Sequence, residues 1–189
     1  MAIQIRLETP RLVLITLDES FAPQVLDFFV RNREHLHPWE PARPPGFYQL
    51  EFQRRQLAFD QLKMSTGQLF KVWLFKKDDR DLEKVIGSVV VSEIMRGCFL
   101  SAFLGYRMDK GHQGQGLMTE AVGEVVRYAF DELGLHRLEA NIMPRNKASL
   151  RVVEKLGFYE EGVGIKYLYI NGRWEDHIHM VIRNPALEE

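Results

Sequence analysis

The chain has few features that would cross-link it, direct its secretion or anchor it in a membrane. Only one of its 189 residues is a cysteine, Cys98, which excludes an intramolecular disulfide and a cysteine-rich zinc site. No apolar run approaches the ~20 residues that span a bilayer. The segment Met1–Glu8 also lacks the pattern of a secretory signal. A single free cysteine without an export signal is typical of a reducing compartment, so we expect a cytoplasmic protein with no membrane partner.

The chain also lacks an excess of charge of either sign. Its 25 lysines and arginines face 26 aspartates and glutamates, a formal net charge of −1. This balance excludes a protein that coats nucleic acid by bulk charge, and we expect no direct nucleic-acid partner. A length of 189 residues is that of one ordinary domain. We therefore expect residues 1–189 to form a single domain, and the sequence leaves open whether it is a monomer or a homodimer.

Seven runs of β-branched and aromatic residues predict strands. Charged turns separate several of them, as in a meander, and the sequence Asn171-Gly172 predicts a hairpin turn between the last two. Helical segments are interleaved with the strands, but not in strict alternation. This order predicts an α/β (α+β) fold with one mixed, mostly antiparallel sheet. The seven predicted strands are residues 11–17, 69–75, 85–94, 99–108, 137–143, 167–170 and 174–182.

Apolar positions spaced by three or four residues predict about four helices. Asp18 and Asn146 are capping residues at the start of two of them. A third helix spans residues 117–133 and stops at Gly134. The fourth spans residue 47 to about residue 64. Its positions predicted to point inward are Leu50, Leu57, Ala58 and Leu62.

A proline-rich segment at residues 38–46 holds four of the eight prolines of the chain. Such a segment can be neither helical nor internal to a sheet. It is too short for a domain linker, so we expect a loop ordered against the body of the protein. Trp39, with the neighbouring Phe47 and Tyr48, either lines a peptide groove or packs as an ordinary loop residue.

The most informative segment runs from a strand ending at Met108 through a glycine-rich turn into the helix that begins near Leu117. Glycines let a backbone approach a ligand closely, and a helix N-terminus offers unpaired N–H groups and a positive dipole. The dinucleotide fingerprint would need glycine where Thr119 stands, and the NTPase loop is absent. The turn therefore predicts a phosphate site, with a plain turn as the alternative.

A basic stretch follows the next predicted strand. Five cations fall within residues 137–155, and only Glu139 and Glu154 oppose them. A polyphosphate bound at the first helix could use one or two of these cations, although each one alone is explained as a solvated charge. The five are Arg137, Arg145, Lys147, Arg151 and Lys155.

These motifs resemble the GNAT N-acetyltransferases. Gln113-Gly114-Gln115-Gly116 matches the acetyl-CoA loop Q/R-x-x-G-x-G/A of that superfamily, and Asn146 to Ser149 with Leu156-Gly157-Phe158 matches the helix that follows. Over nearly the whole chain the resemblance extends to the RimJ type, bacterial enzymes that acetylate the N-terminal amine of a ribosomal protein. Further residues that carry it are Asn32-Arg33, Pro38-Trp39-Glu40-Pro41, Leu104-Gly105-Tyr106, Asn141, Met143-Pro144, Asn171-Gly172, Trp174 and Asp176-His177.

The resemblance implies the GNAT fold, with central strands that splay apart and acetyl-CoA wedged where those ending near Met108 and Met143 diverge. The pantetheine arm would pair with the strand edge near Tyr106 and Met108. Asn141, Asn146 and Ser149 are implied contacts along the arm, and Asn146 is also a helix cap. The loop that would hold the pyrophosphate comprises Gln113, Gly114, Gln115, Gly116, Leu117 and Met118, where Met118 replaces the usual Gly or Ala, as it does in RimJ-like sequences.

The resemblance also implies direct attack of a neutral amine on the thioester, without a covalent enzyme intermediate. Backbone N–H near Met108 would stabilise the oxyanion. Many members of the superfamily place a proton-donating tyrosine seven residues after the capping asparagine, where this chain has Val153. Ser149 is the best substitute for donating or relaying that proton, and a serine at a helix start explains it equally well.

No general base stands out. Glu40 is the first candidate for meeting a cationic amine, beside Trp39 on the substrate side, and Glu139 is the second. An α-amine with a pKa of about 7.7–8.0 is already neutral in about a tenth of molecules at pH 7, far more than a lysine at ~10.4. The missing base therefore favours a protein N-terminus, of a ribosomal protein by the resemblance.

Two alternatives stay open, and two further features are weighed against a role. The acceptor can be a small amine, or the chain can be a non-catalytic acetyl-CoA-binding module, which only Val153 and the missing base support. His177 and His179 lie on one side of a predicted strand, but no third ligand is evident, so we expect no metal. Cys98 has no histidine partner placed by the sequence, and direct transfer needs no acyl-cysteine.

Overall fold

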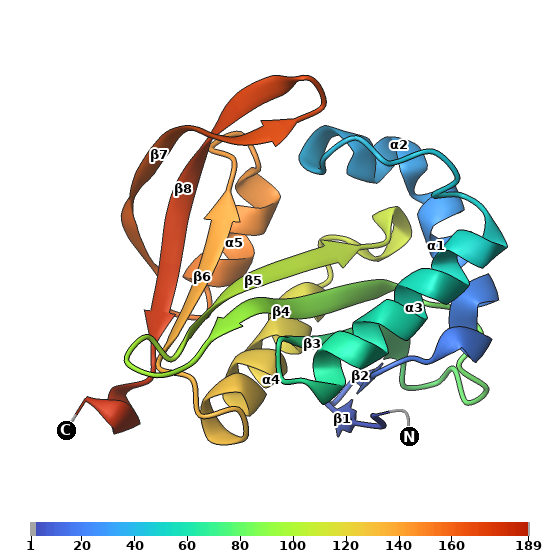
Figure 1. Ribbon diagram of the computed structural model, residues 1–189, viewed down its shortest axis with the longest axis horizontal. Coiled ribbons are helices and arrows are strands. Elements are labelled where there is room, and N and C mark those ends of the chain that lie inside the picture. The colour runs from blue at the N-terminus through green and yellow to red at the C-terminus, as the bar shows by residue number, and fades with distance from the viewer. Residues whose placement is uncertain (1–2, 189) are drawn as a thin grey trace.

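Figure 1 shows the computed structural model, which describes residues 3–188. Met1 and Ala2, part of the segment searched for an export signal, lie outside the described residues, as does Glu189. No helix in the described part is long and apolar enough to cross a membrane. The α-helices are α1 (Ala22–Arg31), α2 (Arg33–Leu36), α3 (Leu50–Ser65), α4 (Leu117–Asp131) and α5 (Lys147–Glu154). Four 3-10 turns are η1 (Glu19–Phe21), η2 (His37–Trp39), η3 (Lys110–His112) and η4 (Pro185–Leu187).

All strands of the described residues join one mixed sheet in the order β1-β2-β3-β4-β5-β6-β8-β7. Every neighbouring pair is antiparallel except β5 and β6, which are parallel. The mixed, mostly antiparallel sheet is thus confirmed. The strands are β1 (Arg6–Glu8), β2 (Leu12–Ile15), β3 (Leu69–Lys76), β4 (Gly87–Met95), β5 (Ser101–Met108), β6 (Arg137–Ile142), β7 (Tyr159–Ile170) and β8 (Arg173–Arg183).

The sheet has eight strands where seven were predicted. The additional strand, β1, is only 3 residues long, too short for an alternating pattern to register. β7 also begins well before the predicted residue 167, at Tyr159. Register shifts after Glu160 and Gly164 break its pairing with β8, and irregular pairing of this kind disrupts the period of two.

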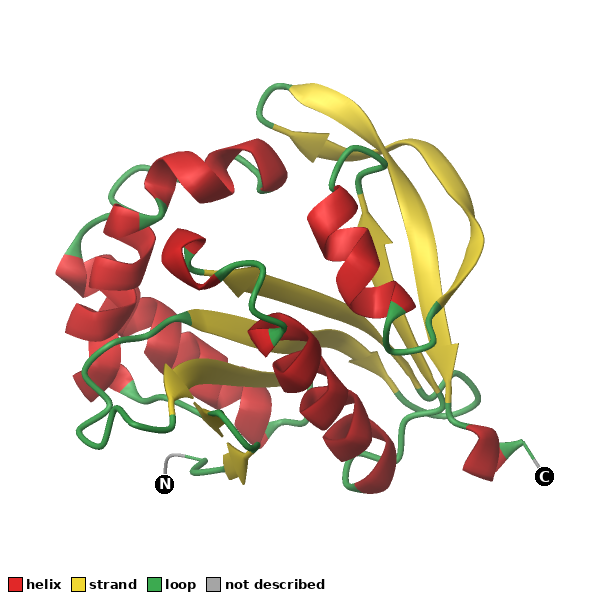
Figure 2. Ribbon diagram, turned by 180° about the vertical axis from the view of Figure 1, so that it is seen from behind, coloured by secondary structure: helices red, strands yellow, loops and turns green. Residues whose placement is uncertain are grey.

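Helices cover both faces of the sheet, α4 and α5 on one side and α1 and α3 on the other (Figures 1 and 2). Alternation along the central strands supplies both cores. Val72 and Leu74 of β3 pack with α4, whereas Trp73 and Phe75 pack with α1 and α3. Central strands are therefore apolar at successive positions, which made them prominent in the sequence.

The inward face of α3 differs in part from the prediction. Leu57 is buried as expected, but Leu62 is 60% exposed. The buried positions are Gln53, Leu57, Asp60 and Met64, which follow the helical period with polar residues among them. Asp60 is stabilised there by an ion pair with Lys71, 2.7 Å away. A prediction based on apolar residues alone therefore placed Leu62 on the buried face of α3, where the polar residues Gln53 and Asp60 lie instead.

The parallel strands β5 and β6 splay apart. They are paired only from Ser101 to Phe103 on β5, opposite Arg137 to Glu139 on β6, and they diverge beyond this point (Figure 1). The splay predicted between Met108 and Met143 is confirmed. It opens the sheet at its centre, between two helical layers.

Candidate active site

A cavity of about 780 Å³ occupies the wedge between β5 and β6. This volume lies within the range of small-molecule sites. Its wall comes from both strands, α5, the turn before α4, the segment from α2 into the proline-rich loop, and His177 of β8. It brings together nearly all of the predicted site residues: Trp39, Glu40, Tyr106, Met108, Gln113, Gly114, Gly116, Leu117, Met118, Asn141, Asn146 and Ser149.

The glycine-rich turn is shaped by two left-handed residues. Gly114 has φ +73° and Gly116 has φ +76°, a conformation that costs other residues strain. Gly116 caps α4 without a side-chain hydrogen bond, so the first N–H groups of this 15-residue helix are available to an anion. Gln115 lies outside the cavity wall, and its carbonyl oxygen accepts a hydrogen bond from Arg11 at 2.8 Å.

An acidic residue in the first turn of α4 does not oppose this anion site. Glu120 accepts hydrogen bonds from the backbone N–H of Arg11 at 2.9 Å and from its Nε at 2.7 Å. Burial tends to raise the pKa of Glu120, but the hydrogen bonds from Thr9 and Arg11 outweigh it and lower the pKa. The carboxylate charge is therefore compensated by Arg11, which also donates to the Gln115 carbonyl oxygen in the turn.

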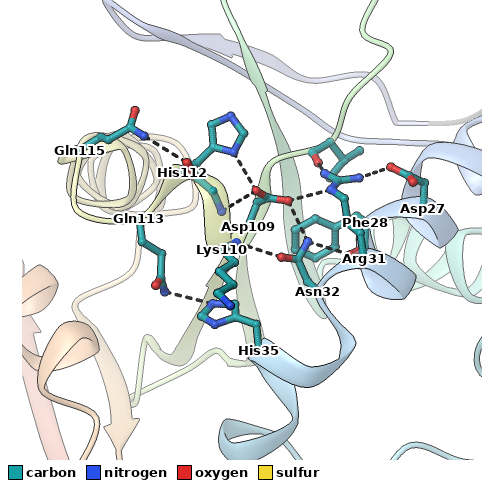
Figure 3. Close-up of polar contacts among 12 residues, drawn as sticks. Asp27, Phe28, Arg31, Asn32, His35, Asp109, Lys110, His112, Gln113 and Gln115 are labelled. Atoms are coloured by element: carbon teal, nitrogen blue, oxygen red, sulfur yellow. Dashed lines mark hydrogen bonds and ion pairs between the residues drawn. The ribbon is translucent and has the colours of Figure 1, made fainter.

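A buried carboxylate, Asp109, braces the turn against Arg31 and Asn32 (Figure 3). Asp109 accepts hydrogen bonds from Arg31 Nε at 2.7 Å and Asn32 Nδ2 at 2.9 Å. It also accepts from the backbone N–H of Gly111 at 2.9 Å and contacts His112 Nδ1 at 2.9 Å. Burial would raise the pKa of Asp109, but the hydrogen bonds from Asn32, His112 and Arg31 hold it well below its usual range. Asp109 thus joins the end of α1 to the turn as a permanent anion.

Asn32 completes this brace, a role that no local sequence pattern predicts. It is 1% exposed, and its Oδ1 accepts the backbone N–H of Lys110 at 2.9 Å. Three residues further along, in α2, His35 Nε2 lies 3.1 Å from Gln113 Nε2 in the turn itself. The only sequence signal was the Asn32-Arg33 pair of the resemblance, because contacts across 77 residues leave no local pattern.

Two hydroxyl groups meet at the cavity wall. Ser149 Oγ donates to Tyr106 Oη at 2.7 Å, and Tyr106 donates to the Ser149 carbonyl oxygen at 2.9 Å. Burial raises the pKa of Tyr106 against the opposing hydrogen bond from Ser149, so its hydroxyl keeps its proton near neutral pH. Asn146 Oδ1 accepts the Ser149 N–H at 3.2 Å, which confirms the helix cap. Val153 is fully buried, and the tyrosine hydroxyl at the site comes from β5 instead.

The wedge face opposite the α4 core carries charged side chains. Glu40 Oε1 lies 2.8 Å from Arg107 Nε, an ion pair in which the N–H is not aligned for a hydrogen bond. The other carboxylate oxygen pairs with Arg43. Trp39 lies beneath the guanidinium of Arg145, 5.1 Å from it. Glu40 and Trp39 therefore both line the cavity, and two guanidinium groups hold the Glu40 carboxylate.

Strand alternation assigns each wall residue to one face. On β5, Tyr106 and Met108 pack with the α4 core, and Arg107 points to the other face, over the ring of Phe29. On β6, Ile142 belongs to the α4 core, so its neighbour Asn141 faces the charged side. Asn141 Oδ1 is buried without a hydrogen-bond partner among residues 3–188. The wedge thus has one side that carries the glycine-rich turn and one charged side.

Glu139 lies outside this wall. Its two oxygens contact Arg137 at 2.7 Å and His179 at 2.8 Å. Burial opposes ionisation, but the hydrogen bonds from His179 and Arg137 lower the pKa of Glu139. Within the part of the chain that the structure describes, no three or more His, Cys, Asp or Glu side chains are grouped to hold a metal ion.

The splayed parallel pair, the glycine turn at a helix start and the cavity between them define an acetyltransferase of the GNAT class. The profile described as the acetyltransferase (GNAT) domain matches residues 11–159, and the chain belongs to this family. It is therefore an N-acetyltransferase, a class that uses acetyl-CoA. Membership in the family argues against a non-catalytic module.

Relatives match the chain along nearly its whole length. A protein of Bacillus subtilis (strain 168) named probable N-acetyltransferase YjcK is 40% identical over 173 residues, covering 92% of this chain and 94% of the relative. The [ribosomal protein uS5]-alanine N-acetyltransferase of Escherichia coli (strain K12) is 35% identical over 183 residues, covering 96% and 92%. Both alignments are longer than the region, residues 11–159, that matches the GNAT family.

Solved structures share the fold. The ribosomal-protein-S5-alanine acetyltransferase from Vibrio fischeri has a TM-score of 0.90 and 36% identity, covering 95% of this chain and 97% of that one. Mycobacterium smegmatis RimJ in complex with CoA-disulfide has a TM-score of 0.87 at 23% identity, covering 98% and 89%. The second likeness is one of fold alone.

Proposed function

We propose that the chain transfers the acetyl group of acetyl-CoA to the N-terminal α-amine of a protein, with a ribosomal protein as acceptor. One observation carries this proposal: the 35% identity with the uS5-alanine enzyme spans 96% of the chain. The match therefore includes α2, the proline-rich loop and the β7–β8 hairpin, which lie on the acceptor side, as well as the cofactor loop.

Acetyl-CoA would enter from the side of α4 and α5. Backbone N–H groups of the loop would hold its pyrophosphate, with the helix dipole adding to the attraction. The pantetheine arm would follow the β5 edge near Tyr106 and Met108, with Asn141 and Asn146 as polar contacts. Since Asn146 Oδ1 already accepts from Ser149, its amide nitrogen is the group left for the arm. The proposed loop donors are Gln113, Gly114, Gly116, Leu117 and Met118.

The oxyanion donor follows from strand geometry. The Asp109 N–H donates to Ile86 on the β4 side of β5 at 2.8 Å. Successive N–H groups of a strand point to opposite edges, so the Met108 N–H points toward the wedge. When the amine nitrogen attacks the thioester carbon, this N–H would stabilise the negative oxygen of the tetrahedral species.

Collapse of that species breaks the C–S bond and releases the CoA thiolate, which needs a proton. Ser149 would donate or relay it, since its hydroxyl already contacts the protonated Tyr106 hydroxyl. On the other side, Glu40 and Trp39 would receive the acceptor N-terminus. The carboxylate attracts a cationic amine, and the arginine pair around it prevents an isolated buried charge.

Steady-state acetylation of an Ala- or Ser-starting peptide tests the proposal. We expect turnover of the peptide to exceed that of spermidine and of an aminoglycoside. A small-amine acceptor is the second candidate, because a spermidine N(1)-acetyltransferase of Vibrio cholerae is 32% identical over 71 residues. That match covers only 38% of this chain. Turnover of spermidine without turnover of any peptide would reject the N-terminal proposal.

A further inference from the structure

His177 is the one residue of β8 in the cavity wall. It is 3% exposed, so it is a buried ring with a small accessible area. It comes from the hairpin strand that pairs with β6, more than 130 residues along the chain from Glu40. The reaction proposed above leaves it without a role.

Strand register places His177 on the acceptor side. β8 pairs with β6 so that Ile178 lies opposite Ile142, and His179 lies opposite Asn141. Ile142 and Ile178 belong to the core under α4. The residue before Ile178 therefore points to the opposite face, the same face as Asn141. His177 thus shares the charged side of the wedge.

The tautomer of the His177 ring is set by its backbone contact. Nδ1 lies 3.0 Å from the Glu175 carbonyl oxygen, and a carbonyl oxygen can only accept. Nδ1 therefore carries the proton, and Nε2 of the neutral ring has a free lone pair. Nε2 has no hydrogen bond to any residue from 3 to 188, and it is not among the fully covered unpaired atoms. The accessible part of the ring includes this nitrogen.

The surroundings keep the ring neutral. Burial lowers the pKa of His177 and His179 lowers it further, outweighing the opposite effects of Glu175 and Asp176. From β7, the ring of Tyr167 contacts it with centroids 6.0 Å apart. The ring is therefore uncharged at pH 7 and able to accept a proton. By contrast, the carboxylates of Glu40 and Glu139 are occupied by cationic partners.

We infer that His177 Nε2 takes the proton that the acceptor amine loses during acetyl transfer. The inference rests on the proposed function for the identity of the amine. The amine lone pair forms the C–N bond, the C–S bond breaks, and the thiolate receives a proton from Ser149 Oγ, which regains one from solvent. The proton from nitrogen passes to Nε2, and solvent takes it when product leaves. Asn141 Oδ1, unpaired on the same face, would accept the second N–H and orient the lone pair, which leaves the Asn141 amide nitrogen for the pantetheine arm.

The variant His177→Asn isolates this role. The asparagine amide can still donate to the Glu175 carbonyl, as Nδ1 does, but it has no basic nitrogen. We expect kcat with an Ala-starting peptide to fall about 100-fold at pH 7, the usual size of a general-base effect. The Kd for acetyl-CoA and the Tm should stay at the wild-type values. His179→Asn is the matched control on the same strand and face, and it should retain kcat within about threefold.

The pH profile separates a proton acceptor from a merely structural residue. Hydroxide can take the proton in place of Nε2, and its concentration rises with pH for wild type and variant alike. The deficit of His177→Asn should therefore shrink between pH 7 and pH 9. Added imidazole should also restore part of the rate to His177→Ala and leave wild type unchanged. A deficit that is constant with pH and that imidazole does not relieve would overturn the inference.

The outcomes distinguish this inference from the proposed function. Peptide turnover by wild type with His177→Asn within twofold at every pH would overturn the role of His177 alone. Turnover of spermidine but of no peptide would overturn the N-terminal acceptor, and the same comparison of variants would then be made with spermidine. Absence of turnover with any amine would overturn both.

Discussion

The two sides of the wedge are built differently. The glycine turn on the proposed cofactor side is continuous in sequence, from Tyr106 into α4, and the contacts proposed for its pyrophosphate are backbone N–H groups. The acceptor side is assembled from the proline-rich loop, one residue of β5, Asn141 and His177 of β8, and its contacts are side chains. A backbone site needs glycine and a helix start in a fixed order, so it leaves a motif. A side-chain site needs only proximity, which strand pairing supplies.

The largest effect is expected at the backbone site. Gly116→Val places a β-branched residue at φ +76°, which distorts the turn and misaligns at least two charge-assisted hydrogen bonds to phosphate. At about 1.5 kcal/mol each, the Kd for acetyl-CoA should rise about 100-fold, measured by isothermal titration. Gly134→Val, at φ +61° in the turn after α4, carries similar strain away from the cavity. An equal loss of affinity in both variants would contradict the role of the turn.

Loss of the Asp109 contacts that brace the turn should lower the free energy of unfolding more than the other substitutions do. Asp109→Asn leaves Arg31 and Asn32 facing another amide, and we expect unfolding to be easier by about 2–3 kcal/mol, measured by denaturant titration. The pKa of Asp109 is lowered in the folded state, so its contribution is present above about pH 4 and fades as pH falls further. The gap between wild type and variant should therefore narrow between pH 4 and pH 2.

Asp131→Asn is the control, since its ion pair with Arg127 is exposed and worth at most about 1 kcal/mol. A gap for Asp109→Asn that widened in acid would contradict the assignment of a stabilising carboxylate.

The hydroxyl pair should affect the rate and not cofactor binding. Ser149→Ala removes the donor beside Tyr106, and kcat should fall about 10-fold while the Kd for acetyl-CoA stays constant. The initial rate of CoA release at saturating substrate measures kcat. Ser65→Ala, at an exposed serine bonded to the Leu62 carbonyl, is the control. An unchanged kcat would remove Ser149 from the mechanism.

The smallest effect should appear only on the acceptor side. Glu40→Gln leaves the guanidinium groups of Arg43 and Arg107 uncompensated, and these repel a cationic N-terminus. The KM for peptide should rise about 5-fold, since partly exposed charges interact weakly, and the KM for acetyl-CoA should not change. A rise in the KM for acetyl-CoA instead would mean that Glu40 serves the cofactor side.

Local pattern predicted the elements whose signals are contiguous. The helix from Leu117 and the capping role of Asn146 are predicted in this way, whereas the splay near Met108 is implied by the family resemblance. The features that the sequence did not predict depend on contacts between residues far apart in the chain. β1 is defined only by its pairing with β2, and the outward position of Leu62 follows from the Asp60–Lys71 ion pair. The sequence places His177 in the family resemblance and beside His179, but it predicts no catalytic role for it, because its face depends on the register of β8 against β6.

Mass spectrometry of the N-termini of ribosomal proteins, from cells with and without this enzyme, is the most direct test of a protein α-amine as acceptor. We predict that one N-terminal alanine or serine is acetylated only when the enzyme is present, and that a copy carrying His177→Asn fails to restore it. Unchanged N-terminal acetylation in cells lacking the enzyme would contradict the proposal.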